Sequence, residues 1–318
     1  MEITPGVFWK CPRRLQSACM LPAWCRRLPV FRTYEALRLT QDRLAATKDE
    51  LKRTRDERDR AKRLSAHILA HGKLKDILRA HTDAYRSAEP FPHVVIEELV
   101  DPALLRDVVA EFDAMDRTPW HHTERATERK YSTEEFQRFG PTTRSVMSQL
   151  NAAPFMAFLE KLTGIAGLIP DPHLRGGGLY EIRRGGSLGV HADFNFYKRL
   201  NLFRRLNLLL YLNENWSEEW GGHLELWDRT GKRCMQRIAP IFNRAVIFDT
   251  SNFSYHGHPH PLECPDNRSR KSLALYYYTV EAPADEDRTP HTTLFIQNDG
   301  TPASEDAETP AAIGRPPG

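Results

Sequence analysis

The sequence lacks long hydrophobic stretches and has little cysteine. No apolar run approaches the roughly 18–20 residues of a membrane-spanning helix. The N-terminus, MEITPGVFWKCPRR, has no basic-then-apolar signal-peptide layout. The 5 cysteines are sparse, and Cys11, Cys19 and Cys25 form no CxxC pair, which fits a reducing compartment rather than a disulfide scaffold. We therefore expect a cytoplasmic protein without membrane contact.

A strong excess of charge of either sign is also missing. The net charge is only +3, so the total gives no reason to expect a nucleic-acid partner. Hydrophobic residues at 40% and aromatic residues at 10% are sufficient for a packed core. A length of 318 residues allows one large or two small domains.

The N-terminal part divides into a leader and a helical segment. Residues 1–33 are basic and irregular, and two interpretations stay open: an unstructured leader, or a contact with nucleic acid or an acidic membrane. Residues 34–86 are full of strong helix formers. Leu37, Leu44 and Leu51 recur every seven residues, although the partner positions are mostly polar. A solvated single helix and a weak coiled coil, forming a homodimer through residues 34–66, both stay open.

A second unit is expected over residues 87–285. Its first segment, HVVIEELV, predicts a strand with Val94 and Ile96 inward. Asp101-Pro102 then supplies a helix N-cap and a first-turn proline. NAAPFMAFLEKLTGI predicts another helix that ends near Gly164. We expect these helices to cover one face of a β core.

Two stretches of this unit are expected to be loops that select the substrate, residues 115–145 and 194–206. Ser132 with Glu135 predicts a helix cap in the first loop. Lys198 to Arg205 predicts a charged turn in the second. That turn is either solvated or pairs with an anionic group of the substrate.

The remaining segments have the rhythm of strands. LNLLLYLN, GGHLELWD, NRAVIFDT and RKSLALYYYT are short and apolar, and glycines at 176–178 and 185–186 predict hairpin turns around GLYEIRR. With further short strands the set suffices for a mainly β fold, a double-sheet jelly roll with buttressing helices. Residues 286–318 are expected to be a largely disordered tail, in which only Leu294, Phe295 and Ile296 are able to pack.

One pattern carries the chemistry. His191-Ala192-Asp193 places two ligand types two residues apart, so at a strand end both side chains point to the same face. His256 must come from a different strand, and His258 in the same turn is the alternative. Two imidazoles and one carboxylate are the ligand set of non-haem Fe(II) oxygenases. We predict that His191, Asp193 and His256 bind a metal.

With these residues the sequence resembles the 2-oxoglutarate/Fe(II)-dependent dioxygenases of the prolyl 4-hydroxylase-like superfamily. The resemblance covers roughly residues 87–285 and rests on Tyr180, His191-Ala192-Asp193, Tyr211-Leu212-Asn213, Trp216, Gly221-Gly222, His256 and Arg270-Lys271-Ser272. It implies a double-stranded β-helix, and Fe(2+), 2-oxoglutarate and O2 as cofactor and co-substrates, with ascorbate as a supporting reductant. In related halogenases a small residue replaces the carboxylate, so Asp193 favours hydroxylation of an unactivated C–H, with release of succinate and CO2. The substrate is expected to be a small molecule or a peptide.

The far carboxylate of 2-oxoglutarate needs a fixed cation, and the planar fork of arginine binds a carboxylate bidentately. Arg268 and Arg270 are the candidates. Arg270 is preferred because Ser272 follows on the same strand face and can donate a second hydrogen bond. The resemblance implies that Tyr180 also reaches a co-substrate carboxylate, with Tyr211 as the second candidate.

Two other classes of protein stay open. A cupin-type metal enzyme that is not an oxygenase would usually offer three or four histidines and lack the Arg270-x-Ser272 element. A catalytically silent binding protein would use the N-terminal helix as its interaction element, but it would have no need of an intact ligand set.

Overall fold

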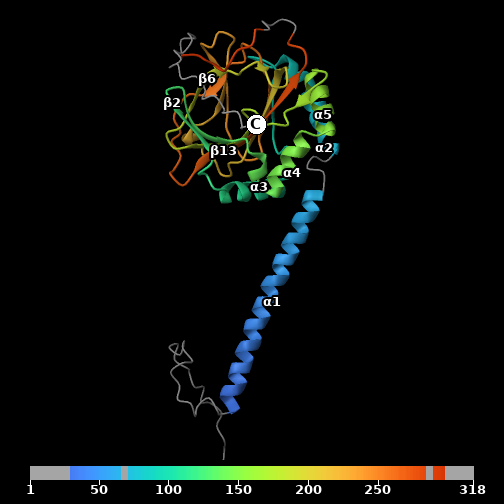
Figure 1. The fold of residues 1–318 in the computed structure, drawn as a ribbon, viewed down its shortest axis with the longest axis vertical. Coiled ribbons are helices and arrows are strands. Elements are labelled where there is room, and N and C mark those ends of the chain that lie inside the picture. Colours follow the sequence, from blue (N-terminus) through green and yellow to red (C-terminus); the bar gives the residue numbers. More distant parts are fainter. Residues whose placement is uncertain (1–28, 66–70, 284–288, 298–318) are drawn as a thin grey trace, which may run out of the picture. The chain divides into compact units, whose positions relative to one another are not determined.

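The computed structural model describes residues 29–65, 71–283 and 289–297 (Figure 1). The chain divides into two compact units, residues 1–62 and 63–318. Most of the predicted basic leader lies outside the described residues. Among those described, no helix combines the length and the apolar character that crossing a membrane requires.

The first unit is built on helix α1 (Pro29–Ser65). Its heptad leucines Leu37, Leu44 and Leu51 are 56%, 55% and 71% exposed. An i,i+4 ion pair, Arg38 with Asp42, lies on the surface of the same helix and contributes little to stability. The helix is therefore solvated as the structure describes it, and its pairing with a second copy stays a prediction.

Helix α2 (His71–Ser87) belongs to the second unit. Leu74 and Ile77 lie in the main hydrophobic core, and the buried Tyr85 donates its hydroxyl to Asp249 at the end of strand β11 (Ala245–Asp249). The compact unit therefore begins before the boundary predicted at residue 87. The helical segment 34–86 is divided between the two units.

The core of the second unit is one continuous antiparallel sheet that folds over as a half-barrel (Figure 1). Its order is β1-β11-β8-β13-β5-β3-β6-β12-β9-β10, with four short strands alongside. The strands are β1 (His93–Ile96), β2 (His121–Arg125), β3 (Glu128–Thr133), β4 (Ile169–Pro170), β5 (Gly178–Arg183), β6 (Leu188–Ala192), β7 (Phe196–Tyr197), β8 (Leu202–Tyr211), β9 (Leu224–Trp227), β10 (Cys234–Ile238), β11, β12 (His256–His258), β13 (Ser269–Thr279) and β14 (Leu294–Phe295). The predicted jelly-roll fold class is confirmed.

The alternation of side chains along β8 and β13 separates an outer face from a barrel interior. Leu206, Leu208 and Leu210 of β8 pack in the main core with Leu273, Leu275 and Tyr277 of β13. Helices α3 (Pro102–Ala114), α4 (Pro141–Leu150) and α5 (Ala153–Thr163) supply much of the rest of that core. The opposite face, with Tyr211 and Arg270, therefore points into the barrel.

The predicted start of α3 and the predicted end of α5 are confirmed. The Asp101 side chain accepts a hydrogen bond of 2.9 Å from the backbone N–H of Leu104, which caps α3. Gly164 ends α5 in the left-handed conformation with φ of 78°, which glycine adopts without steric cost. The predicted strand around Val94 and Ile96 is β1, with both side chains buried.

Three local predictions are wrong because pairing with distant strands overrides them. Ser132 lies in β3, not at a helix cap, and residues 121–133 form the β2–β3 hairpin within the expected loop. Strands β5 and β6 do not pair as a hairpin; β3 lies between them. By contrast, the packing expected of Leu294, Phe295 and Ile296 within the tail is confirmed. Leu294 and Phe295 form β14, which pairs with β6, and the Ile296 N–H donates to the Val190 carbonyl. Residues 298–318 lie outside the described part.

Candidate metal centre

The sheet brings His191 and His256 side by side. Strand β12 pairs with β6, and His256 is the direct partner of His191. Asp193 follows immediately after β6. Its carboxylate oxygens lie 3.6 Å from His191 Nε2 and 3.5 Å from His256 Nε2. The three residues form a candidate metal cluster whose ligand atoms all lie within 4.8 Å of one another, and His258 is not part of it.

The two histidines are held in the form that binds a metal. The backbone carbonyls of Gly189 and Ser254 each accept a hydrogen bond of 2.9 Å from Nδ1 of His191 and His256. A carbonyl can only accept, so Nδ1 carries the hydrogen and Nε2 keeps its lone pair for the metal. Burial, together with His191, lowers the pKa of His256 to about 4. The ring is therefore neutral at pH 7, as ligation requires.

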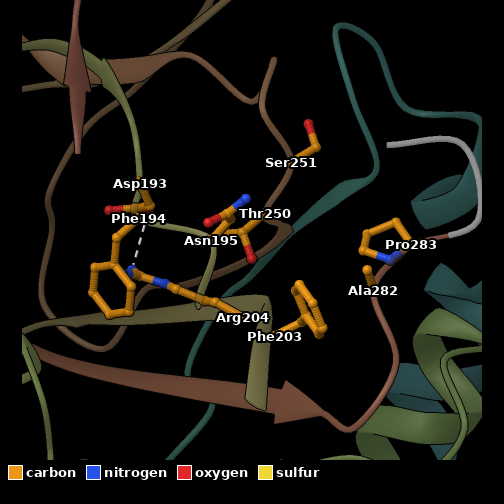
Figure 2. Close-up of a pocket in the computed structure, with 9 residues that line it drawn as sticks. All are labelled: Asp193, Phe194, Asn195, Phe203, Arg204, Thr250, Ser251, Ala282 and Pro283. Atoms are coloured by element: carbon orange, nitrogen blue, oxygen red, sulfur yellow. Dashed lines mark ion pairs between the residues drawn. The ribbon is translucent and has the colours of Figure 1, made fainter. Parts of the chain in front are cut away.

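A buried guanidinium and a side-chain amide fix the Asp193 carboxylate. The Arg204 guanidinium lies 3.0 Å from Asp193 Oδ2, as the dashed line in Figure 2 marks. Asn207 Nδ2 donates a hydrogen bond of 2.7 Å to the same oxygen. Arg204 in turn donates two hydrogen bonds to Asn207 Oδ1. Burial opposes ionisation of Asp193, yet Arg204, with His256 and His191, holds the pKa of its carboxyl well below the usual range. The carboxylate is thus charged and oriented, a fit for a divalent cation.

A β-bulge places Arg204 at this site. Along β8, Leu206 pairs with Tyr277 but Arg204 pairs with Tyr278, so Arg205 has no partner in β13. The extra residue reverses the alternation, and Arg204 faces the interior, 3% exposed, with its guanidinium 3.4 Å from the centre of the Tyr276 ring. The predicted charged turn is therefore wrong in extent, because β8 begins at residue 202. One feature of the sequence indicates a role for Arg204: it lies with Asn207 in a strand that is mostly apolar.

The interior beyond the histidines holds the predicted co-substrate residues. Arg270 is 5% exposed, and it donates from Nε to the Gly222 carbonyl at 2.7 Å and from Nη2 to the Tyr211 hydroxyl at 3.1 Å. Ser272, 4% exposed, pairs with Tyr211 across β13 and β8, so the two side chains share the face on which Arg270 lies. Arg268 precedes the strand, is half-buried and lies beside the Trp220 ring.

Tyr180 lies on the same face but its hydroxyl is directed elsewhere. It is the register partner of Ser272 in β5, and its hydroxyl donates to the Gly176 carbonyl. Burial raises the pKa of Tyr180 to about 12. Tyr211, the second candidate by sequence, is the tyrosine that the structure joins to Arg270. The geometry therefore supports Tyr211 more than Tyr180, and the roles of both toward the co-substrate stay predictions.

Two further parts of the predicted motif are structural. Asn213 donates to the carbonyls of Pro240 and Lys271 at 2.7 and 3.1 Å, which ties the end of β8 to β13. The Trp216 indole donates to the Gly221 carbonyl at 3.1 Å. The Trp216 hydrogen bond holds the loop whose Gly222 carbonyl accepts the hydrogen bond from Arg270.

A pocket opens beside Asp193 (Figure 2). It is lined by Asp193, Phe194, Asn195, Phe203, Arg204, Thr250, Ser251, Ala282 and Pro283. Its wall combines aromatic rings and a proline with short hydroxyl and amide side chains. The Thr250 hydroxyl is buried without a hydrogen-bond partner among the described residues.

Comparison with known proteins identifies the family. Residues 177–278 match the model of the 2OG-Fe(II) oxygenase superfamily. These residues therefore form a 2OG-Fe(II) oxygenase domain, and the protein is an enzyme, a 2-oxoglutarate-dependent dioxygenase. The matched range contains all three members of the candidate metal cluster and Arg270.

The similar solved structures are distant. A Pseudomonas putida prolyl-4-hydroxylase is 15% identical, with 64% of this chain and 98% of that chain covered and a TM-score of 0.44. A Trichoplax adhaerens prolyl hydroxylase, solved with a hypoxia inducible factor peptide, is 15% identical with 66% and 93% covered and a TM-score of 0.48. HygX from Streptomyces hygroscopicus, solved with nickel and 2-oxoglutarate, is 12% identical with 66% and 87% covered and a TM-score of 0.41. No curated protein matches the chain. The assignment of the oxygenase domain therefore rests on the family match over residues 177–278 and on the cluster of His191, Asp193 and His256.

Proposed function

We propose that this oxygenase hydroxylates an unactivated C–H bond of its substrate and converts 2-oxoglutarate to succinate and CO2. In that reaction one oxygen atom of O2 enters succinate and the other enters the new hydroxyl group. The observation that supports it most is the His191, Asp193 and His256 cluster on paired strands, with ligand atoms within 4.8 Å of one another. Fe(II) held there would supply the oxidising chemistry.

The chain's own residues prepare the site for this reaction. The Gly189 and Ser254 carbonyls orient the imidazoles, while Arg204 and Asn207 orient the Asp193 carboxylate. A metal ion held by these three residues would keep coordination positions open for the co-substrate. Arg270, with Tyr211 and Ser272 beside it, would bind the far carboxylate of 2-oxoglutarate as a charge-assisted pair inside the barrel.

The pocket beside Asp193 is the proposed entrance for the primary substrate. Its side chains include the rings of Phe194 and Phe203 and the hydroxyls of Thr250 and Ser251. Such a wall suits a group with an apolar face and a hydrogen-bonding edge, found in a small molecule or in a peptide. Arg204 is engaged with Asp193 rather than open to an anionic substrate group.

Three finer elements complete the proposal. Ascorbate would keep the iron in the Fe(II) state. The small number of cysteines favours a location in the cytoplasm. The exposed leucines of α1 would pair with those of a second copy, which gives a homodimer through residues 34–66. A cupin-type function has less support, since a third histidine does not join the described cluster.

The test is succinate formation from 2-oxoglutarate by the iron-loaded protein across a panel of metabolites and peptides. We expect a low basal rate that a true substrate raises, and a hydroxylated product in equal amount. His191→Ala supplies the matched inactive control. A metal-loaded protein that consumes no 2-oxoglutarate with any member of the panel, or without a substrate, would argue for the silent binding protein instead.

A further inference from the structure

His258 is a buried imidazole that the metal cluster does not use. It is 3% exposed, and neither Nδ1 nor Nε2 has a hydrogen-bond partner among the described residues. The same is not true of His191 and His256, whose Nδ1 atoms are bonded to carbonyls. Leaving a buried polar group without a hydrogen-bond partner is unfavourable, so an imidazole with two unpaired nitrogens needs an explanation.

The position of His258 is next to the anchor of Arg270. Strand β12 runs antiparallel to β9, with Gly257 opposite Glu225, which brings His258 toward the start of β9. The Gly222 carbonyl, just before that start, accepts the hydrogen bond from Arg270 Nε. The ring therefore lies in the part of the interior where the far end of the co-substrate would be bound.

The charges around His258 favour an anion there. Arg270 has a hydroxyl and a carbonyl as its hydrogen-bond acceptors, and neither is charged. Lys130 lies over the Tyr180 ring and pairs with Glu128 at 2.6 Å. A neutral imidazole offers one N–H donor and one acceptor, and a carboxylate beside Arg270 would accept from that N–H.

We propose that His258 is a second recognition residue for the far carboxylate of 2-oxoglutarate, donating a hydrogen bond to the group that Arg270 neutralises. The proposal rests on the function proposed above. It makes His258 a residue that selects acids with a second carboxylate at the correct distance, separate from the three metal ligands. His258 thereby takes part of the function that the sequence assigned to Ser272 and Tyr180.

The experiment compares wild-type protein, His258→Leu and His258→Gln by calorimetric titration of the Mn(II)-loaded full chain without oxygen. The probes are 2-oxoglutarate and oxalate, which chelates a metal through two carboxylates but has no distal arm. We expect His258→Leu to weaken 2-oxoglutarate binding about ten- to a hundredfold, because a hydrogen bond to a charged group is lost. His258→Gln should restore part of the affinity. Mn(II) and oxalate binding should stay unchanged.

Thermal unfolding of the metal-free proteins separates recognition from structure. His258→Leu removes an unpaired buried polar group, so its midpoint should equal or exceed that of the wild type while 2-oxoglutarate binding falls. Equal 2-oxoglutarate affinity in wild type and His258→Leu overturns the proposal for His258 alone. Loss of Mn(II) binding in His258→Leu also overturns the proposal, because it would show that His258 is a metal ligand. If the wild type binds Mn(II) but not 2-oxoglutarate, both this proposal and the proposed function fail.

Discussion

Arg270 tests the co-substrate assignment at the scale of one residue. Replacing it with Leu should raise the Michaelis constant for 2-oxoglutarate about ten- to several-hundredfold, since each charge-assisted hydrogen bond contributes roughly 1.5–3 kcal/mol and each ~1.4 kcal/mol is tenfold. Arg270→Lys should recover part of the loss, because it supplies charge without the fork. Steady-state kinetics with varied 2-oxoglutarate gives the answer.

Arg268→Leu is the matched control for this prediction. Arg268 precedes β13, is half-buried and lies beside Trp220 rather than in the barrel interior, so only a mild effect is expected. A large loss in Arg268→Leu with none in Arg270→Leu would mean that the assumed register of β13 does not describe the co-substrate site.

Arg204 tests how the metal ligand Asp193 is oriented. Arg204→Met should weaken Mn(II) binding about ten- to a hundredfold, as is usual when a partner of a metal ligand is removed. The Asp193 pKa should rise toward its ordinary range, so metal binding should be lost at a higher pH than in the wild type. Mn(II) titrations over a series of pH values measure both effects.

The neighbouring arginine provides the control. Arg205→Met changes the bulge residue that has no partner in β13, and Mn(II) affinity should stay within about twofold of the wild type, since surface substitutions away from such sites change little. Equal losses in the two variants would assign the effect to the bulge and not to the Arg204–Asp193 pair.

The sequence predicts the metal ligands but not the side chains that orient them. His191 and Asp193 are two residues apart, and the apolar pattern around them indicates a strand, so their common face is predictable. Arg204 reaches Asp193 only because a bulge shifts the alternation in β8, and no local pattern in LFRRLNLLLY marks that shift. The sequence favoured His256 over His258 without deciding between them, since both lie in one turn and the choice depends on which one pairs with His191.

Helix α2 gives the test at the scale of an element. Leu74 is 7% exposed, in the main core. Leu74→Ala should lower the free energy of unfolding by about 2–5 kcal/mol, as for other buried leucines. Leu44→Ala on α1, where the leucine is 55% exposed, should leave stability nearly unchanged. Urea unfolding of both variants measures the difference.

A truncation series extends this prediction. Removal of residues 1–62 should leave a stable, active oxygenase, because α2 stays in place. Removal of residues 1–80 also deletes Leu74 and Ile77 from the core, so we expect a clear loss of stability. Equal stability of the two truncated proteins would show that this part of α2 does not belong to the compact unit.

Local residues predicted several elements, but not the distant partners of others. Alternation and capping predicted β1, α3 and the end of α5, where local residues decide the structure. The helical character of α2 was expected, and so was packing of Leu294 and Phe295. Their partners were not predicted: Tyr85 donates a hydrogen bond to Asp249, and Phe295 pairs with His191 across β14 and β6. A single sequence does not state which distant segments will meet.

Acid stability is a property of the whole metal-free molecule. The pKa of His256 is lowered to about 4, against about 6.5 in the unfolded chain. Between these values the unfolded chain binds a proton that the folded chain does not, so the free energy of unfolding should fall as pH falls from about 6.5 to 4, by roughly 3 kcal/mol at most. His258, whose pKa is also lowered, acts in the same direction.

Urea unfolding of the metal-free protein at several pH values measures this slope. His256→Gln should have a shallower slope over the same window. The Asp193 carboxyl, with its lowered pKa, adds stability that is lost only at still lower pH. A metal-free wild type whose stability is flat from pH 6.5 to 4 would contradict a neutral, buried His256.

Anaerobic Fe(II) binding by the wild type and four single variants tests the metal centre. We predict one tightly bound Fe(II) per wild-type chain. Binding should be strongly reduced in His191→Ala, Asp193→Ala and His256→Ala, while circular dichroism should show that these variants keep the fold. His258→Ala should bind Fe(II) as the wild type does. Retained binding in His256→Ala together with loss in His258→Ala would contradict the assigned metal centre.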